Sequence, residues 1–110
     1  MVKYTTQSGN VYEVNPDGSF KNGNILEELV LVGGVVPGAV PERTITDQGV
    51  AFKLHIRKYP QKEDYLLFLS ELDMGNGWER VNQDYVQFTL EYTHRENVRK
   101  IRTNPIKEIS

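Results

Sequence analysis

Two segments of the chain alternate between apolar and polar residues with a period of two, and this pattern limits the fold more than any other feature. Every second side chain is apolar in residues 50–56, and the same holds in residues 86–92. Successive side chains of a β-strand point to opposite faces, so each segment predicts a strand with one buried and one exposed face. The exposed face of the first strand would carry Lys53, His55 and Arg57.

The composition favours a sheet over a helical bundle. The chain of 110 residues contains twelve Val and six Ile but only two Ala. Ala is the best helix former, whereas β-branched side chains lose rotamer freedom in a helix. We therefore expect a single all-β or β-dominated α+β domain over residues 1–110, a small antiparallel barrel or sandwich of about six to eight strands with room for one or two short helices. The predicted core comprises Tyr4, Tyr12, Val14, Phe52, Leu54, Ile56, Leu67, Phe88 and Leu90.

Two hairpins are expected within this sheet. Residues 2–6 and 11–14 are β-type runs on either side of a turn-rich tetrad, which is typical of a hairpin. Residues 44–46 are followed by a short polar turn and then by the alternating segment 50–56. We expect these two segments to pair as a second hairpin.

Two further segments fit either a helix or a strand. In residues 25–32, the capping-box spacing of Asn24 and Glu27 favours a short helical turn that runs into a strand. In residues 60–74, the continuous apolar run 65–69 favours a buried strand after a polar loop. A helix over the same residues is the alternative, because periodicity alone cannot separate a buried strand from a buried helix.

The residue types that support most enzyme chemistry are missing or scattered. The chain has no Cys, which excludes disulfides and thiolate metal sites. Its two histidines, His55 and His94, lie far apart and lack the spacing of metal ligands. No phosphate-binding loop and no nucleophile motif is present. We expect no catalytic residues, no cofactor and no metal, and hence a protein that is not an enzyme.

A basic surface is the first candidate site. Alternate residues of one strand face lie about 7 Å apart, so Lys53, His55 and Arg57 would project together. If the basic residues near the C-terminus lie beside them, aromatic side chains could stack on single-stranded nucleic acid there. The alternative is that these charges only keep an exposed face solvated. The candidate surface for a partner or a nucleic acid is Lys53, His55, Arg57, Lys58, Trp78, Tyr85, Arg95, Arg99 and Arg102.

An uncharged apolar stretch at residues 29–41 is the second candidate site. Because Gly and Pro interrupt it, it fits either a buried strand with a connector or an exposed segment that docks on a partner. The candidate docking residues are Val32, Val35, Val36 and Val40. Such a segment, or an open sheet edge, predicts self-association or a protein partner.

The two ends of the chain carry a resemblance. Residues 5–14 read TTQSGNVYEV, and this opening resembles the T-x-S-G-x-x-Y-E-V hairpin of short uncharacterised bacterial and phage all-β proteins. Residues 102–109 read RTNPIKEI and are similar to their T-S-P-V-x-x-I ending. The resemblance implies neighbouring first and last strands and a bacterial or phage setting, and it transfers no functional residues. Pro105 donates no ladder hydrogen bond, so it predicts an edge or a bulge in the last strand.

The expected location and function follow from these observations. The N-terminus lacks the apolar segment of a secretory signal, and no apolar stretch is long enough to span a bilayer. We therefore expect a cytoplasmic protein without a membrane partner. The function expected first is a non-enzymatic binding or assembly module that acts through protein–protein contact, as a phage or bacterial accessory protein. A nucleic-acid-binding module is the alternative, and a small enzyme of unknown class comes third.

Overall fold

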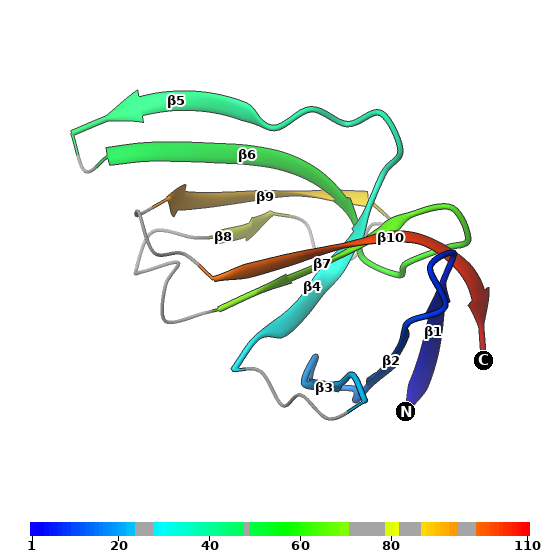
Figure 1. Cartoon of the computed structure of the whole chain (residues 1–110). Coiled ribbons are helices and arrows are strands. Elements are labelled where there is room, and N and C mark those ends of the chain that lie inside the picture. The colour runs from blue at the N-terminus through cyan, green and yellow to red at the C-terminus, as the bar shows by residue number, and fades with distance from the viewer. Residues whose placement is uncertain (24–27, 48, 71–78, 82–86, 95–98) are drawn as a thin grey trace.

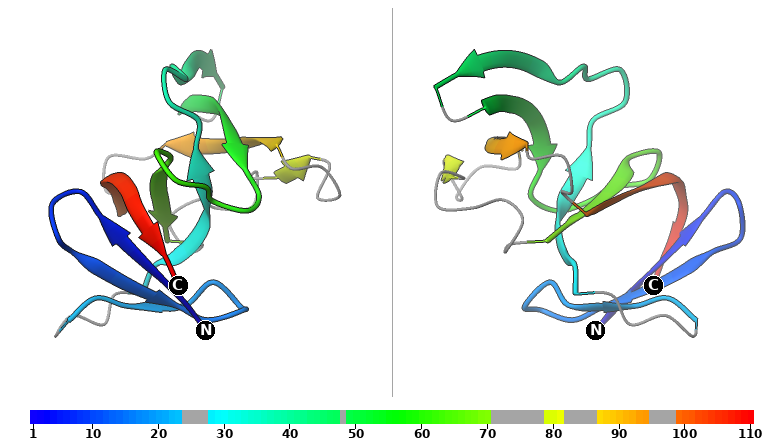
Figure 2. Two further views of the ribbon diagram at one scale, coloured as in Figure 1. Left: turned by 90° about the vertical axis from the view of Figure 1, so that its right-hand side faces the viewer. Right: turned by 60° about the vertical axis from the view of Figure 1, so that its left-hand side comes forward.

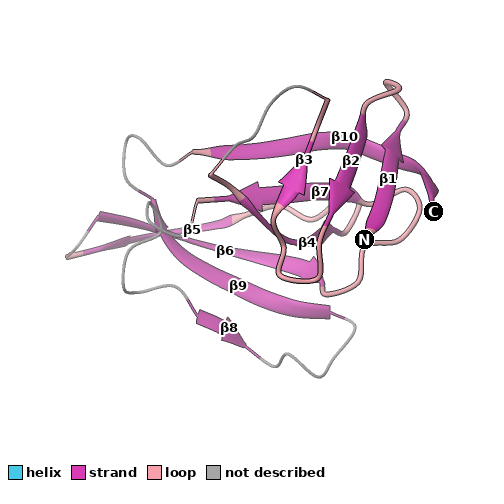
Figure 3. Cartoon of the chain, turned by 90° about the horizontal axis from the view of Figure 1, so that it is seen from below, coloured by secondary structure: helices cyan, strands magenta, loops and turns pink. Residues whose placement is uncertain are grey.

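The regular elements of the protein are β-strands (Figure 3). The computed structural model describes residues 1–23, 28–47, 49–70, 79–81, 87–94 and 99–110. The all-β expectation is confirmed for these residues, and no helix lies among them. Two of the strands have only two and three residues, and the other eight have four to ten. The strands are β1 (Val2–Thr6), β2 (Val11–Val14), β3 (Phe20–Lys21), β4 (Val30–Val35), β5 (Glu42–Thr46), β6 (Gly49–Arg57), β7 (Tyr65–Leu69), β8 (Glu79–Val81), β9 (Gln87–His94) and β10 (Lys100–Ile109).

The strands form one open antiparallel sheet (Figure 1). The order from one edge to the other is β3-β2-β1-β10-β7-β4-β6-β9-β8, and β5 pairs with β6 off this path. The described strands therefore do not close into a barrel. An isolated bridge between Ser19 and Val30 brings the turn before β3 against β4. The Leu31 N–H adds a 2.7 Å bond to the Gly18 carbonyl, so the sheet curves back on itself at this point.

Strand β10 joins the two ends of the chain. Its first part pairs with β7, and its last part pairs with β1, where Ile109 lies opposite Tyr4. The neighbouring first and last strands implied by the resemblance are thus observed. The register of β10 against β7 shifts between Arg102 and Pro105. Pro105 lies at this irregularity, as expected for a residue without an N–H.

Strand β7 is buried on both faces. Leu66 and Phe68 pack into a core with the aromatic residues of β1, β2 and β3. Leu67 and Leu69 pack into a second core with β4 and β6. A strand covered on both sides reads as a continuous apolar run, which explains why β7 lacks alternation. The helix alternative for residues 60–74 is wrong over the described part, and residues 71–74 lie outside it.

Some of the other sequence predictions are confirmed, and some concern residues that the structure does not describe. In residues 25–32 the strand part is confirmed as β4, whereas the expected helical turn falls mostly on residues 24–27, outside the described residues. The first hairpin is confirmed as β1–β2, and the second as β5–β6. Six predicted core residues are buried, and Phe52 is half-buried. Phe88 and Leu90 belong to β9, whose side chains are not among those that the structure describes.

The β5–β6 hairpin, residues 42–57, forms an arm at the end of the molecule opposite β1–β3 (Figures 1 and 2). Strand β9 pairs with β6 from Val50 to Arg57 and so occupies one edge of β6. Strands β4 and β5 pair with different parts of the other edge, β4 with residues 56–57 at the base of the arm and β5 with residues 49–53. The outer edge of β5 pairs with no described strand.

Candidate protein-interaction surface

The predicted basic face of β6 is present in part. Lys53 and His55 are exposed on it, whereas Arg57 is paired with a buried carboxylate. The two exposed residues alternate with the buried Leu54 and Ile56 as expected. The register places Lys53 between an acidic residue of β5, Glu42, and an acidic residue of β9. Cross-strand pairs of opposite charge stabilise a sheet face. The surroundings of Lys53 therefore suit a solvated sheet face.

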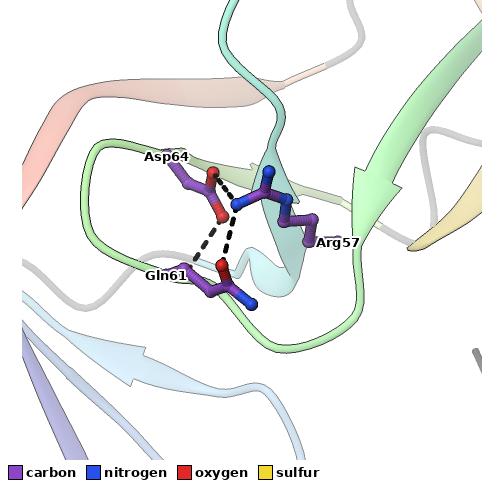
Figure 4. A network of polar contacts seen from close by, with 3 residues as sticks. All are labelled: Arg57, Gln61 and Asp64. Carbon is purple, nitrogen blue, oxygen red and sulfur yellow. Dashed lines mark hydrogen bonds and ion pairs between the residues drawn. The ribbon is translucent and has the colours of Figure 1, made fainter. Parts of the chain in front are cut away.

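Arg57 turns from this face to a buried carboxylate (Figure 4). Its Nη1 lies 3.2 Å from Oδ1 of Asp64, and it donates a 2.9 Å hydrogen bond to Oε1 of Gln61. The other oxygen of Asp64, Oδ2, accepts the Gln61 N–H at 2.9 Å. These contacts hold the connection between β6 and β7 in place. Arg57 is thereby committed to the fold and is not offered to an anionic ligand.

The remaining basic candidates lie on other parts of the sheet. The Arg102 guanidinium lies 4.7 Å from the ring centre of Tyr65, and Arg99 lies 3.4 Å from a carboxylate oxygen of Glu28. Both arginines belong to the β10 region, and β7 and β4 separate β10 from β6. The ammonium group of Lys58 lies 5.5 Å from the ring centre of Tyr59. Trp78, Tyr85 and Arg95 lie outside the described residues. Within the described residues, the predicted basic patch is therefore divided.

The predicted apolar docking segment is divided between core and surface. Val32 and Val35 are buried in the core between β4, β6 and β7, so they are not available to a partner. The interpretation of residues 29–41 as a buried strand with a connector is correct for these two. Val36 is half-buried, and Val40 has 79% of its surface exposed.

The edge strand β5 is the most exposed strand of the described sheet whose side chains can be assessed. Glu42, Arg43, Thr44 and Ile45 are all exposed, so neither face of β5 is covered. Ile45 has 81% of its surface exposed, the largest value among the exposed large hydrophobic residues. It lies opposite Val50, on the face that continues into the core through Phe52. An apolar strip thus runs out of the core and ends at an uncovered edge.

Sequence reasoning identified this strand but not its role as a surface. The signal is present in the run Arg43-Thr44-Ile45-Thr46, because a strand with a single large apolar side chain has no face that it can bury. The β-branched residues of this run favour a strand, and its polar and charged residues favour exposure to solvent.

A hollow of about 400 Å³ opens beside the turn between β2 and β3. Its rim includes Asp17, Lys58, Tyr59 and Pro60. Hydrogen bonds from the Ser19 hydroxyl, at 2.6 Å, and the Ser19 N–H, at 2.9 Å, lower the pKa of Asp17. The lining contains the carboxylate of Asp17, the side-chain ammonium group of Lys58 and the N-terminal residue Met1.

Within the described residues, no three side chains of His, Asp or Glu gather as metal ligands would. No helix suited by length and apolar character to crossing a bilayer occurs there either. Comparison with protein-family models, with curated proteins and with solved structures finds no match to the chain.

Proposed function

We propose that the protein is a non-enzymatic binding or assembly module that acts through protein–protein contact at the outer edge of β5. The observation that supports this most is the exposure of all four described side chains of β5, from Glu42 to Ile45, on a strand with one free edge. An unpaired edge presents a row of backbone donors and acceptors to an incoming strand. A partner that adds a strand here would gain main-chain hydrogen bonds and would cover Ile45.

The side chains of β5 suit a role in selecting the partner. Arg43 and Ile45 lie on one face and Glu42 and Thr44 on the other, because successive residues of a strand alternate. A strand that pairs with β5 would therefore meet a cation and an apolar side chain on one face, and an anion and a hydroxyl on the other. Main-chain bonds would supply affinity, and these pairs would supply specificity.

The nucleic-acid alternative has less support from the described residues. Arg57 is paired with Asp64, and Arg102 is stacked on Tyr65 and belongs to β10, which β7 and β4 separate from β6. The protein also has a formal net charge of −2, which gives little long-range attraction for polyanions. The bacterial or phage cytoplasm remains the proposed setting, on the resemblance of the chain ends.

Site-specific photo-cross-linking tests this function. A photoreactive amino acid is introduced at position 45 and, as the control, at Lys107, an exposed residue of β10. We expect a defined protein to cross-link at position 45 and not at position 107. With the cross-linked protein purified, binding should be lost in Ile45→Pro, since proline removes an edge N–H and is tolerated in edge strands. Equal cross-linking at both positions, or unchanged binding by Ile45→Pro, would contradict the proposal.

A further inference from the structure

We propose that the partner of β5 is a second copy of this chain, paired antiparallel about a two-fold axis that passes beside Ile45. This inference rests on the proposed function and identifies the protein that binds the outer edge of β5. It would join two arms into one continuous sheet, in which β5 of each copy is the central pair.

The hairpin register indicates which backbone groups of β5 are available. Thr46 lies opposite Gly49 across a two-residue connection, and residues that flank such a connection bond to each other. Bonded and non-bonded positions alternate along an antiparallel pair, so Glu42 and Thr44 also face β6. Arg43 and Ile45 then direct their N–H and C=O groups outward, and Asp47 follows in the turn directly after β5.

Three two-fold registers centred within β5 bring these outward positions together. A pairing centred on Arg43 would set two like charges opposite each other, which destabilises a sheet. A pairing centred on Thr44 would set Arg43 against Ile45, a cation against an apolar side chain. A pairing centred on Ile45 brings Arg43 of each copy to the end of the other β5, beside Asp47 in the turn that follows that strand.

The register centred on Ile45 satisfies charge and burial together. It forms two Arg43–Asp47 pairs of opposite charge, one on each side of the axis. It also brings the two Ile45 side chains together, and these are the most exposed large apolar side chains in the described residues. Arg43 and Asp47 are both exposed and take part in no ion pair among the described contacts, so the pairing does not disrupt the fold. A self-complementary patch is what a two-fold interface requires.

A charge-exchange cycle followed by analytical ultracentrifugation tests the register. The protein is examined from about 10 μM to about 1 mM, because an interface built on one short strand falls in the small, weakly associating class. We expect a concentration-dependent dimer. Arg43→Asp and Asp47→Arg should each weaken association by at least about tenfold, since each creates two like-charge pairs per dimer. The double variant exchanges the two charges and should restore association to within about threefold of the wild type.

Matched controls separate this effect from net charge and from folding. Lys107→Asp and Glu108→Arg make the same charge changes on β10, away from the arm, and should leave association unchanged. Thermal unfolding of all variants should remain close to that of the wild type because the changed residues are exposed. In the wild type, the amides of Arg43 and Ile45 should exchange more slowly as the protein concentration rises.

The ultracentrifugation and cross-linking results together show whether the dimer, the proposed function or both fail. A protein that remains monomeric over the whole range overturns the inference. So does a dimer whose association does not follow the charge-exchange cycle. If cross-linking at position 45 nevertheless captures a different protein, the proposed function stands and its occupant is another chain. If neither a dimer nor a captured partner is found, both fail.

Discussion

Nη1 of Arg57 lies 3.2 Å from Oδ1 of Asp64, a carboxylate that has no exposed surface. Arg57 ends β6 and Asp64 directly precedes β7, so this pair closes the connection between the two strands. The backbone of Asp64 is tied to the last strand as well, because its carbonyl accepts the Ile106 N–H at 2.9 Å. The charge pair therefore lies where the arm, β7 and β10 meet.

Removal of the Arg57 charge alone should destabilise the fold more than removal of the charges of both Arg57 and Asp64. Arg57→Met leaves the Asp64 carboxylate buried without a counter-charge, and we expect a loss of about 2 kcal/mol in the free energy of unfolding. This is less than for a wholly buried pair, since a quarter of the Arg57 side chain is exposed. Urea unfolding measures the change.

The double variant Arg57→Met with Asp64→Asn is the comparison for this loss. Asn keeps an acceptor for the Gln61 N–H and carries no charge, so part of the stability should return. Lys107→Met, at an exposed position, controls for loss of a surface charge and should change stability by less than about 0.5 kcal/mol. A double variant less stable than Arg57→Met would show that the ion pair is not the source of the effect.

The elements that depend on local pattern could be predicted from the sequence. The alternation in residues 50–56 identifies β6 and its buried face, because burial of every second residue is a property of the strand itself. The hairpins at the N-terminus and in the arm follow from turn residues between β-type runs. β7 follows from an apolar run whose length suits a strand.

The arrangement of the site depends on contacts between distant segments, and these could not be predicted. The pattern places Arg57 on the outer face of β6, but the bend of the next connection decides that it meets Asp64. Likewise, Ile45 would have been a core residue if another strand had covered β5. Its exposure results from the strand order, which sequence periodicity does not determine.

Gly33 and Gly38 both have a positive φ, but only Gly33 has close neighbours, so substitutions at the two positions can be compared. Gly33 has a φ of +151°, and a Cβ there would lie 2.6 Å from the Arg57 carbonyl oxygen and against the Ile56 side chain. Gly38 has a φ of +83° and open space around it. We expect Gly33→Ala to destabilise the protein by about 3 kcal/mol or more, and Gly38→Ala by about 1 kcal/mol. Chemical unfolding checks both, and equal losses would argue against close packing at Gly33.

Phe68 is the central ring of the core beside β1–β3. It has no exposed surface, and its ring centre lies 4.0 Å from that of Phe20 and 5.4 Å from that of Tyr12. Phe68→Ala should destabilise the protein by about 3–5 kcal/mol through lost burial and a residual cavity. Tyr59→Ala, at a ring with 65% exposure, is the control and should have a small effect on the unfolding midpoint. Comparable losses in the two variants would be inconsistent with this core.

The stability of the protein should decrease in alkali because two tyrosines of this core are buried. Burial raises the pKa of Tyr4 and of Tyr12 above the ordinary tyrosine value of 10.0, and for Tyr12 a hydrogen bond with Asn10 opposes part of the rise. The unfolded chain therefore releases these protons first. The contribution of the neutral rings is complete below about pH 10 and is lost as the pH rises through the folded-state values.

Urea unfolding at intervals from about pH 8 to about pH 11 should show this decrease, and Tyr4→Phe should make it shallower. The same variant at neutral pH, where both side chains are uncharged, provides the reference for lost hydroxyl contacts. A decrease of equal steepness in the variant and the wild type would mean that ionisation of Tyr4 is not coupled to unfolding.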